Sequence, residues 1–373
     1  MSVQFPVFAR PSRVDRRAQK INDPIQRLRY LRSATNSPIY RPVLAWRWAA
    51  SLAVAILIVP LASDAVIRKP VARKRSTATT RYPDTDTPVV WPVEQNSQYD
   101  LYSNGLRIEN GLAVSNQPRE YSLIALGSDT LGPTRSQPAG IVFHITESDQ
   151  VPFESSQKTK LTKVGRELLL YVRTKRSYHF VIDRFGRVHR IVVESDAANH
   201  AGNSVWADGQ WAYLELNESF LGVAFEARTQ PDQPTINEAQ IHSARALTEM
   251  LRGKYNLPAA NCVTHSQVSV NPGNMRIGWH TDWGAGFPFK DVGLPDNYPI
   301  PNPALSLFGF EYDPAYINST GADLQKGLSL AEEQRQKRAD ARGVKVAEYR
   351  KTLEQSYKKL RSAIQDRNAE EDK

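Results

Sequence analysis

The sequence of 373 residues contains a single cysteine, Cys262. One cysteine cannot form an intramolecular disulfide, and it excludes the zinc sites that are built from several cysteines. A chain of this length allows about two domains of ordinary size, each large enough to bury a core. A packed core is therefore expected, and full disorder is excluded.

Excess positive charge is absent from most of the chain, although the formal net charge is +9. Residues 1–81 contain 16 Lys and Arg against 3 Asp and Glu, whereas residues 82–373 contain 32 against 36. The larger part therefore carries a net charge of −4. Because a nucleic-acid-binding domain needs a concentrated positive surface, no nucleic acid is expected as a partner.

Long hydrophobic runs are also absent, with one exception between basic segments. Residues 48–62 read WAASLAVAILIVPLA, and we expect residues 43–67 to form an uncleaved transmembrane helix, since a bilayer requires roughly 20 residues. Trp46 and Trp48 lie at one boundary of this run and cations flank both ends, as is typical of membrane spans. A buried core helix is the alternative.

The charges around this apolar run indicate its orientation. Ten Lys and Arg precede it, and six follow it within a similar distance. The positive-inside tendency then places residues 1–42, a basic segment, in the cytoplasm and the bulk of the chain on the other side of the membrane.

Composition divides the rest of the chain into three regions. Residues 68–138 are expected to be a linker with short strands, which we place within residues 99–126 around the turn signal Asn104-Gly105. Residues 139–300 contain most of the dense apolar runs and form the expected main domain. Residues 301–373 are expected to be a Pro- and Asn-rich strap followed by a charged helical tail.

The tail has an apolar stripe at helical spacing. This pattern predicts a helix that docks on its own domain or forms a short coiled coil, which would offer a site for a protein partner. The stripe consists of Val346, Tyr349, Leu353, Tyr357, Leu360 and Ile364.

The main domain alternates strand and helix signals. The expected fold class is α/β, with a central mixed β-sheet and flanking helices, preceded by the transmembrane helix and followed by the helical tail. A turn at residues 184–186 joins two of the strands as a hairpin. The predicted strands are residues 141–145, 177–183, 188–193, 221–226 and 262–265, and the predicted helices are residues 161–172 and 237–255.

Two histidines lie at the ends of predicted strands, His144 and His265. Asp282 follows in the segment His280-Thr-Asp282-Trp-Gly284. A catalytic zinc typically takes three His or carboxylate ligands and leaves one position for water. A single histidine on an apolar strand is more often a hydrogen-bonded core residue, so spacing alone leaves both readings open.

The residues around these positions carry a resemblance to a known family. Six short segments occur in one order: GIVFHIT at 140–146, YHFVIDRFG at 178–186, HAGNS at 200–204, Asn217 with LGV at 221–223, Thr264-His265, and TDWG at 281–284. Together they resemble the type 2 N-acetylmuramoyl-L-alanine amidases, which include AmpD-like enzymes and peptidoglycan recognition proteins. The resemblance covers about residues 139–290. It implies a catalytic Zn²⁺ bound by His144, His265 and Asp282.

The resemblance also implies supporting roles for other residues. Tyr178 matches a tyrosine beside the metal that orients water, or it is an edge-strand aromatic. His280 stands where relatives often have a lysine that stabilises the oxyanion. His200 is expected to contact substrate, or to cap a loop. The glutamate of AmpD-like enzymes is replaced by Ala224, and Glu226 is expected either to approach the site from the same strand face or to be structural.

The function implied is that of a membrane-anchored, zinc-dependent N-acetylmuramoyl-L-alanine amidase. It would hydrolyse the lactyl–L-Ala amide bond of peptidoglycan or its fragments, from a single-pass position in the bacterial inner membrane with the domain facing the periplasm. Two alternatives remain open: a non-catalytic peptidoglycan-binding module, and a membrane-anchored scaffold whose C-terminal helix recruits a partner.

Overall fold

The computed structural model describes residues 89–229 and 235–371. The predicted cytoplasmic segment, residues 1–42, and the predicted transmembrane helix, residues 43–67, lie outside the described residues. Within the part of the chain that is described, no helix is both long and apolar enough to cross a membrane.

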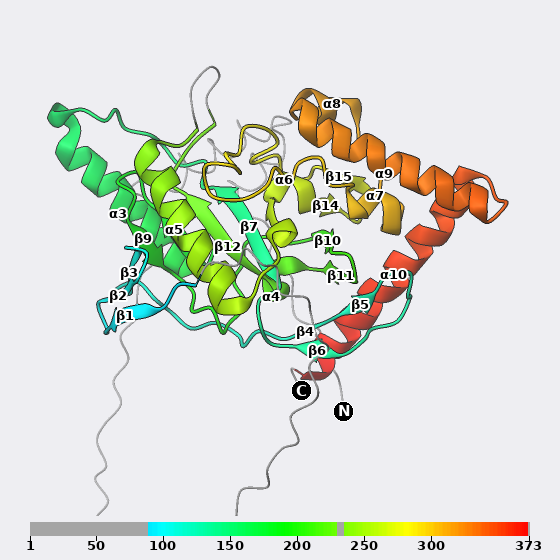
Figure 1. The fold of residues 1–373 in the computed structure, drawn as a ribbon, viewed down its shortest axis with the longest axis horizontal. Coiled ribbons are helices and arrows are strands. Elements are labelled where there is room, and N and C mark those ends of the chain that lie inside the picture. Colours follow the sequence, from blue (N-terminus) through cyan, green and yellow to red (C-terminus); the bar gives the residue numbers. More distant parts are fainter. Residues whose placement is uncertain (1–88, 230–234, 372–373) are drawn as a thin grey trace, which may run out of the picture. The chain divides into compact units, whose positions relative to one another are not determined.

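An eight-stranded mixed sheet forms the centre of the domain (Figure 1). Its strand order is β1-β2-β3-β9-β8-β12-β7-β13, with β12 parallel to β7 and β8, and β13 parallel to β7. The predicted α/β class with a central mixed sheet is confirmed. The strands are β1 (Pro92–Gln95), β2 (Tyr99–Tyr102), β3 (Arg107–Glu109), β7 (Gly140–Ile145), β8 (Phe180–Ile182), β9 (Val188–Arg190), β12 (Phe220–Phe225) and β13 (Cys262–Thr264).

Helices pack on both faces of this sheet. Every residue of β7 and β12 is buried, as is typical of parallel strands covered on both sides. Leu169 and Val172 of α3 (Lys158–Lys175) pack against Ala224 on one face. Helix α5 (Glu238–Tyr255) belongs to the larger core that includes Phe143 on the other face. The two faces therefore differ: His144 and Ala224 share the α3 face, and Phe143 faces the opposite side.

The strongest helix prediction is confirmed in detail. Helix α5 begins after Asn237, whose side chain accepts a hydrogen bond from the backbone N–H of Gln240, and the Gln240 side chain in turn accepts from the backbone of Asn237. This capping box satisfies two N–H groups that the first turn would otherwise leave unpaired. Asn256 ends the helix in the left-handed conformation.

Residues 92–109 of the predicted linker belong to the sheet. Strands β2 and β3 form the hairpin expected at Asn104-Gly105, where Gly105 has a φ of +83°. Strand β3 then pairs in parallel with β9 through Ile108 and Val188. Residues 92–109 thus extend the sheet, because strands of three or four residues gain stability from a neighbour that sequence periodicity does not reveal.

Short elements surround the rest of the sheet. Strands β10 (Val205–Ala207), β11 (Trp211–Leu214) and β5 (Ile124–Ala125) form a second, three-stranded sheet. The predicted strap contains two short helices, α7 (Pro303–Phe308) and α8 (Pro314–Asn318). The remaining elements are β4 (Tyr121–Ser122), β6 (Thr134–Arg135), α4 (Leu216–Ser219), α6 (His265–Val268), β14 (Val270–Asn271) and β15 (Arg276–Ile277).

The charged tail consists of two helices, α9 (Ala322–Ala341) and α10 (Val346–Glu371). Gly343 separates them with a φ of +68°, a conformation that glycine adopts at low cost. Helix α10 packs on α7 and α9, and the ring centroid of Tyr357 lies 4.8 Å from that of Phe310. Of the two alternatives for the apolar stripe, docking on its own domain is confirmed.

Truncating the stripe is expected to destabilise the whole domain. Leu360 is fully buried in the main core cluster, so Leu360→Ala should lower the free energy of unfolding by about 2–5 kcal/mol, through lost burial and the cavity left behind. Urea denaturation measures this value. The exposed neighbour Lys358 provides the control, since Lys358→Ala should stay within about 0.5 kcal/mol of the parent protein. Equal stability of the two variants would contradict this docking.

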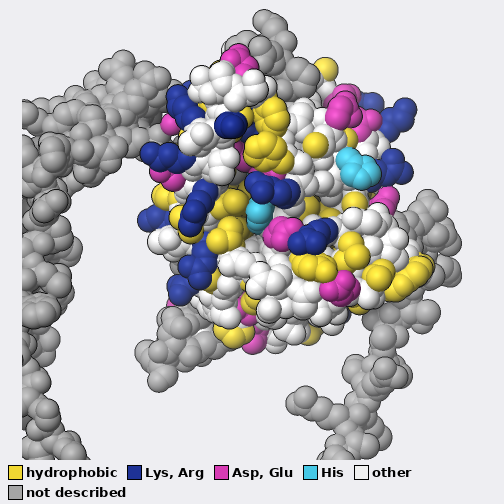
Figure 2. All heavy atoms as spheres, turned by 90° about the vertical axis from the view of Figure 1, so that its left-hand side faces the viewer, with side chains coloured by type: hydrophobic (Ala, Val, Ile, Leu, Met, Phe, Trp, Pro, Cys, Tyr) yellow, Lys and Arg dark blue, Asp and Glu magenta, His cyan; other side chains and the backbone are white. Residues whose placement is uncertain are grey.

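The face of the domain that lies at the left in Figure 1 carries mixed charges. Figure 2 shows Lys and Arg side chains spread over this face, with Asp and Glu and small hydrophobic areas among them. Among the described residues, Leu170 and Tyr171 of α3 are exposed hydrophobic side chains. Isolated exposed apolar side chains are normal on a folded surface.

Candidate metal centre

The sheet brings two of the predicted ligands together. His144 lies on β7, and His265 follows directly after β13, the parallel neighbour of β7. Parallel strands end at the same edge of a sheet, and the two imidazole ring centroids are 4.5 Å apart. The predicted strand 262–265 ends one residue early, because Thr264 and Gln267 form a capping box that makes His265 the first residue of α6.

Asp282 completes the group from a loop. Its Oδ1 lies 2.8 Å from Nδ1 of His265, and its Oδ2 lies 3.4 Å from Nδ1 of His144. Potential ligand atoms of the three residues all lie within 4.8 Å of one another. Adjacent ligands of a tetrahedral zinc with bonds of 2.0–2.1 Å are about 3.3 Å apart. The two imidazoles and the carboxylate therefore fit a catalytic zinc site in both chemistry and spacing.

The electrostatics keep His144 and Asp282 in the protonation states that a metal requires. Burial, together with the adjacent His265, lowers the pKa of His144 to about 4. Burial alone would raise the pKa of Asp282, but the neighbouring His265 and His144 hold it well below its ordinary value. Neutral imidazole and ionised carboxylate are the forms that bind metal.

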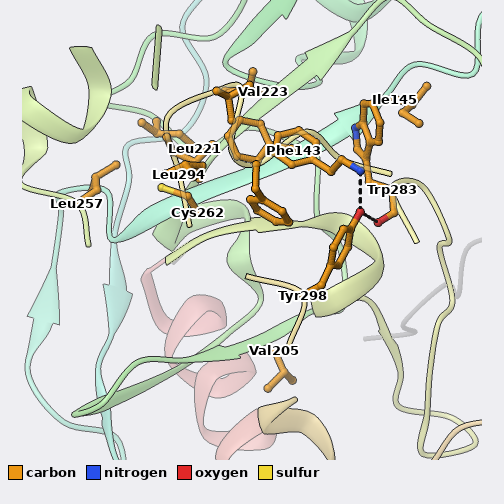
Figure 3. Close-up of a cluster of buried hydrophobic side chains, with 14 of the residues drawn as sticks. Phe143, Ile145, Val205, Leu221, Val223, Leu257, Cys262, Trp283, Leu294 and Tyr298 are labelled. Atoms are coloured by element: carbon orange, nitrogen blue, oxygen red, sulfur yellow. Dashed lines mark hydrogen bonds between the residues drawn. The ribbon is translucent and has the colours of Figure 1, made fainter. Parts of the chain in front are cut away.

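The residue after Asp282 anchors the loop. Trp283 is buried and has a φ of +59°, and its carbonyl accepts hydrogen bonds of 2.8 Å from the hydroxyls of Tyr298 and Ser266. Figure 3 shows Trp283 and Phe143 in one cluster of buried hydrophobic side chains. A left-handed conformation in a tryptophan is uncommon and persists only where the surroundings hold it. The carboxylate of Asp282 is thus presented by a rigid loop.

Tyr178 lies beside the group, as predicted. Its ring centroid is 5.1 Å from that of His144, and its φ of +64° is a strained conformation for a non-glycine residue. Burial raises the pKa of the Tyr178 hydroxyl, so the hydroxyl keeps its proton at neutral pH. It has no hydrogen-bond partner within the described residues, which leaves its O–H free to interact with a substrate or water.

His280 lies on the other side of the group. Its ring stacks on that of His265, with centroids 4.6 Å apart and planes at 19°. Burial and the neighbouring His265 lower the pKa of His280, so at neutral pH it can donate a hydrogen bond only as a neutral imidazole. Trp279, immediately before it, is 64% exposed and lies on the rim of the site.

Glu226 makes its side-chain contacts outside the candidate ligand group, in keeping with the structural alternative expected of it. Its carboxylate accepts a hydrogen bond from the backbone N–H of Arg184 at 3.2 Å and faces Gly165 of α3. None of its hydrogen bonds within the described residues is to the three candidate ligands. Ala224 pairs with His144 across β12 and β7 and is fully buried. Glu226 shares the strand face of Ala224, but it lies beyond the end of β12 and is held beneath α3.

His200 lies against the candidate ligand His144. The residue is 9% exposed, and both of its ring nitrogens face protein atoms. Nδ1 lies 3.0 Å from Nε2 of His144, and Nε2 lies 3.2 Å from the carbonyl oxygen of Phe220. Its contacts are therefore with a candidate ligand rather than with the open side of the site.

Arg119 is a residue near the site that sequence reasoning missed. Its guanidinium is 2% exposed and donates to backbone carbonyls, including that of Phe220. Nothing in the local sequence distinguishes it from the other arginines of a chain with 48 Lys and Arg.

The buried histidines predict a pH-dependent stability of the metal-free protein. The pKa of His144, His179 and His200 is lowered chiefly by burial. The unfolded chain therefore takes up protons below pH 6.5 that the folded chain does not. We expect the free energy of unfolding to fall between pH 7 and pH 4, by up to about 1.4 kcal/mol per pH unit for each histidine.

Urea denaturation of the chelator-treated protein at pH 7, 6 and 5 measures this slope. His179→Gln removes one of the three titrating groups and should make the slope shallower. A free energy of unfolding that stays constant between pH 7 and pH 5 would contradict the prediction.

Comparison with known proteins gives a family match over the residues that form this site. Residues 134–284 match the family model described as N-acetylmuramoyl-L-alanine amidase. Comparison of the sequence with curated proteins gives no match.

Solved structures of low sequence identity are similar over part of the chain. N-acetylmuramoyl-L-alanine amidase LysC from Clostridium intestinale URNW is 19% identical, with 48% of this chain and 93% of that one covered and a TM-score of 0.26. AmiD from E. coli, in complex with anhydro-N-acetylmuramic acid-L-Ala-D-gamma-Glu-L-Lys, is 21% identical, with 42% and 56% covered and a TM-score of 0.31. AmpDh3 from Pseudomonas aeruginosa is 21% identical, with 52% and 84% covered and a TM-score of 0.33.

The match of the family model spans all three candidate ligands, together with Tyr178 and His280. The region that holds the candidate metal centre therefore matches the N-acetylmuramoyl-L-alanine amidase family.

Proposed function

We propose that residues 139–300 form a zinc-dependent hydrolase of the amide bond between the lactyl group of N-acetylmuramic acid and L-alanine. The observation that carries this proposal is the convergence of His144, His265 and Asp282 at one edge of the sheet. These residues would hold the metal through Nδ1, Nδ1 and a carboxylate oxygen. Bound zinc would supply a nucleophile that is active at neutral pH and would polarise the scissile carbonyl.

Two side chains next to the candidate ligands can donate hydrogen bonds to water, to the substrate or to a developing negative charge. Tyr178 keeps its hydroxyl proton and is free to donate a hydrogen bond to water or to the substrate carbonyl. His280, as a neutral imidazole, can donate an N–H to the oxygen on which negative charge develops. Their positions on either side of the ligand group support these roles.

The test is metal analysis of the full chain together with digestion of purified muropeptides. We expect about one zinc per chain and release of the intact stem peptide, identified by its mass. A protein that holds no zinc and leaves the muropeptides intact while still binding them would instead favour a peptidoglycan-binding module.

We also propose that the chain is anchored in the bacterial inner membrane, with this domain in the periplasm. The apolar run at residues 43–67 and the ten-to-six charge bias around it support this location, and peptidoglycan lies on that side of the membrane. Protease added to spheroplasts should remove a tag placed at the C-terminus. Complete protection of the tag in intact spheroplasts, with cleavage only after lysis, would contradict the orientation.

A protein partner recruited by the C-terminal helix is not supported by the packing. The stripe residues Tyr349, Tyr357, Leu360 and Ile364 of α10 are buried in its own domain. The apolar surface that would have formed a coiled coil is therefore already covered.

A further inference from the structure

A continuous set of buried hydrogen bonds connects His144 to Arg119, a residue outside the 134–284 region that matches the family model. Nε2 of His144 is 3.0 Å from Nδ1 of His200, and Nε2 of His200 is 3.2 Å from the carbonyl oxygen of Phe220. Nη1 of Arg119 lies 3.3 Å from the same oxygen. The three side chains are at most 9% exposed, so water does not replace these bonds.

The backbone carbonyl of Phe220, at the centre of this set, determines which ring nitrogens of His200 and His144 carry a proton. A carbonyl oxygen can only accept, so Nε2 of His200 carries the ring proton. A neutral imidazole has one ring proton, which makes Nδ1 of His200 an acceptor and Nε2 of His144 the donor to it. The lone pair of His144 is then on Nδ1, the atom that faces Asp282. The hydrogen bonds thus select the tautomer of His144 that can bind a metal through Nδ1.

A glycine makes room for the ring of His200. A Cβ atom at Gly222 would lie 2.6 Å from Cγ of His200, far inside normal contact distance. Gly222 is on the same strand face as Ala224, which pairs with His144. The ring of His200 therefore lies directly on β12, next to the ligand to which it is hydrogen-bonded.

Arg119 holds the backbone on which His200 depends. Its guanidinium donates to the carbonyl oxygens of Glu194, Glu218 and Asp196 as well as to that of Phe220. These four acceptors belong to two separate segments, the chain after β9 and the chain at the start of β12. A buried charge is tolerated only when it is well hydrogen-bonded, so the arrangement holds both segments in one relative position.

We propose that His200 and Arg119 are positioning residues of the metal centre. His200 fixes the orientation and tautomer of His144, and Arg119 fixes the Phe220 carbonyl to which His200 donates. The segment before the family domain thereby contributes to metal affinity without touching the metal. This inference rests on the proposed zinc site.

The first test measures the zinc dissociation constant of the full chain by competition with a chromophoric chelator. His200→Leu removes both hydrogen bonds and should raise the constant about 10- to 100-fold, the range typical of groups that orient metal ligands. His200→Asn keeps an acceptor close to the position of Nδ1 and should recover part of the affinity. Arg119→Lys keeps the charge but not the fork of donors, and should weaken binding about tenfold.

Arg190→Lys is the matched control. Arg190 is another buried arginine, hydrogen-bonded to Asp100 and Glu194, and it has no contact with Phe220 or His200 within the described residues. Its variant should lose stability but keep the zinc affinity of the parent protein. Folded His200→Leu and Arg119→Lys variants that bind zinc as tightly as the parent would overturn the proposal.

The second test does not depend on zinc. A long-range ¹⁵N–¹H spectrum of the metal-free chain, labelled with ¹⁵N in its seven histidines, reports which nitrogen of each ring is protonated. We expect protons on Nε2 of both His144 and His200. A proton on Nδ1 of His144 would overturn the proposal even if Arg119→Lys fails to fold. If the parent protein binds no zinc, the proposed function fails, and this spectrum still decides the tautomer.

Discussion

Replacing Asp282 by alanine is expected to abolish zinc binding and amidase activity together. Asp282 is the only carboxylate in the group, and it lies within 3.4 Å of Nδ1 of both histidines. Its removal leaves two neutral ligands, too few for a catalytic zinc site. Zinc content by atomic absorption and muropeptide hydrolysis followed by mass measure the two losses in the same preparation.

The control for this variant is Asp291→Ala. Asp291 is an exposed acid a few residues further along the same region, and its removal should change neither zinc content nor rate. Loss of activity in Asp282→Ala with one zinc retained would show that Asp282 acts on the substrate instead of holding the metal. Full activity of this variant would exclude the proposed centre.

Replacing Tyr178 by phenylalanine is expected to lower kcat by about 10²–10³-fold while zinc is retained. The ring of Tyr178 lies 5.1 Å from that of His144, and burial raises the pKa of its hydroxyl, so the group acts with its proton on. Loss of one hydrogen-bond donor to the developing charge typically costs about 10²–10³ in rate. Because phenylalanine keeps the ring and the Cβ atom, the strained backbone at this position should be preserved.

Steady-state kinetics together with zinc analysis test this prediction. Tyr171→Phe, at an exposed tyrosine of α3, is the matched control and should leave the rate unchanged. A rate for Tyr178→Phe within twofold of that of the parent would show that Tyr178 contributes only its aromatic ring to the site and that its hydroxyl has no role in the reaction. Loss of zinc in this variant would show that the hydroxyl supports the ligands.

The core of the domain could be predicted from the sequence because its signals are local. Strands β7 and β12 are short apolar runs, and α5 has a capping box and basic residues in its last turn. His144 and His265 could be predicted as neighbours because they follow apolar runs that end at the same sheet edge. These features depend on residues within a few positions of one another.

The supporting residues of the site could not be predicted in this way. Glu226 lies two residues after Ala224 and therefore on the same strand face. It follows the end of β12, however, and its carboxylate accepts a hydrogen bond from the backbone of Arg184. His200 lies in a loop whose sequence does not show that its ring rests on Gly222. Both outcomes depend on contacts between segments that are far apart in the chain.

The sequence by itself determined the fold class, the candidate metal ligands and the helical tail, since apolar periodicity, capping residues and the ordered family segments are all readable along the chain. Only the tertiary structure decided that residues 92–109 complete the sheet, that His200 supports His144, and that Arg119 holds the Phe220 carbonyl. The physical reason is that a hydrogen bond between residues 20 or 101 positions apart, such as those from His200 and Arg119 to Phe220, leaves no periodic signal. It exists only once the strands have paired and excluded water.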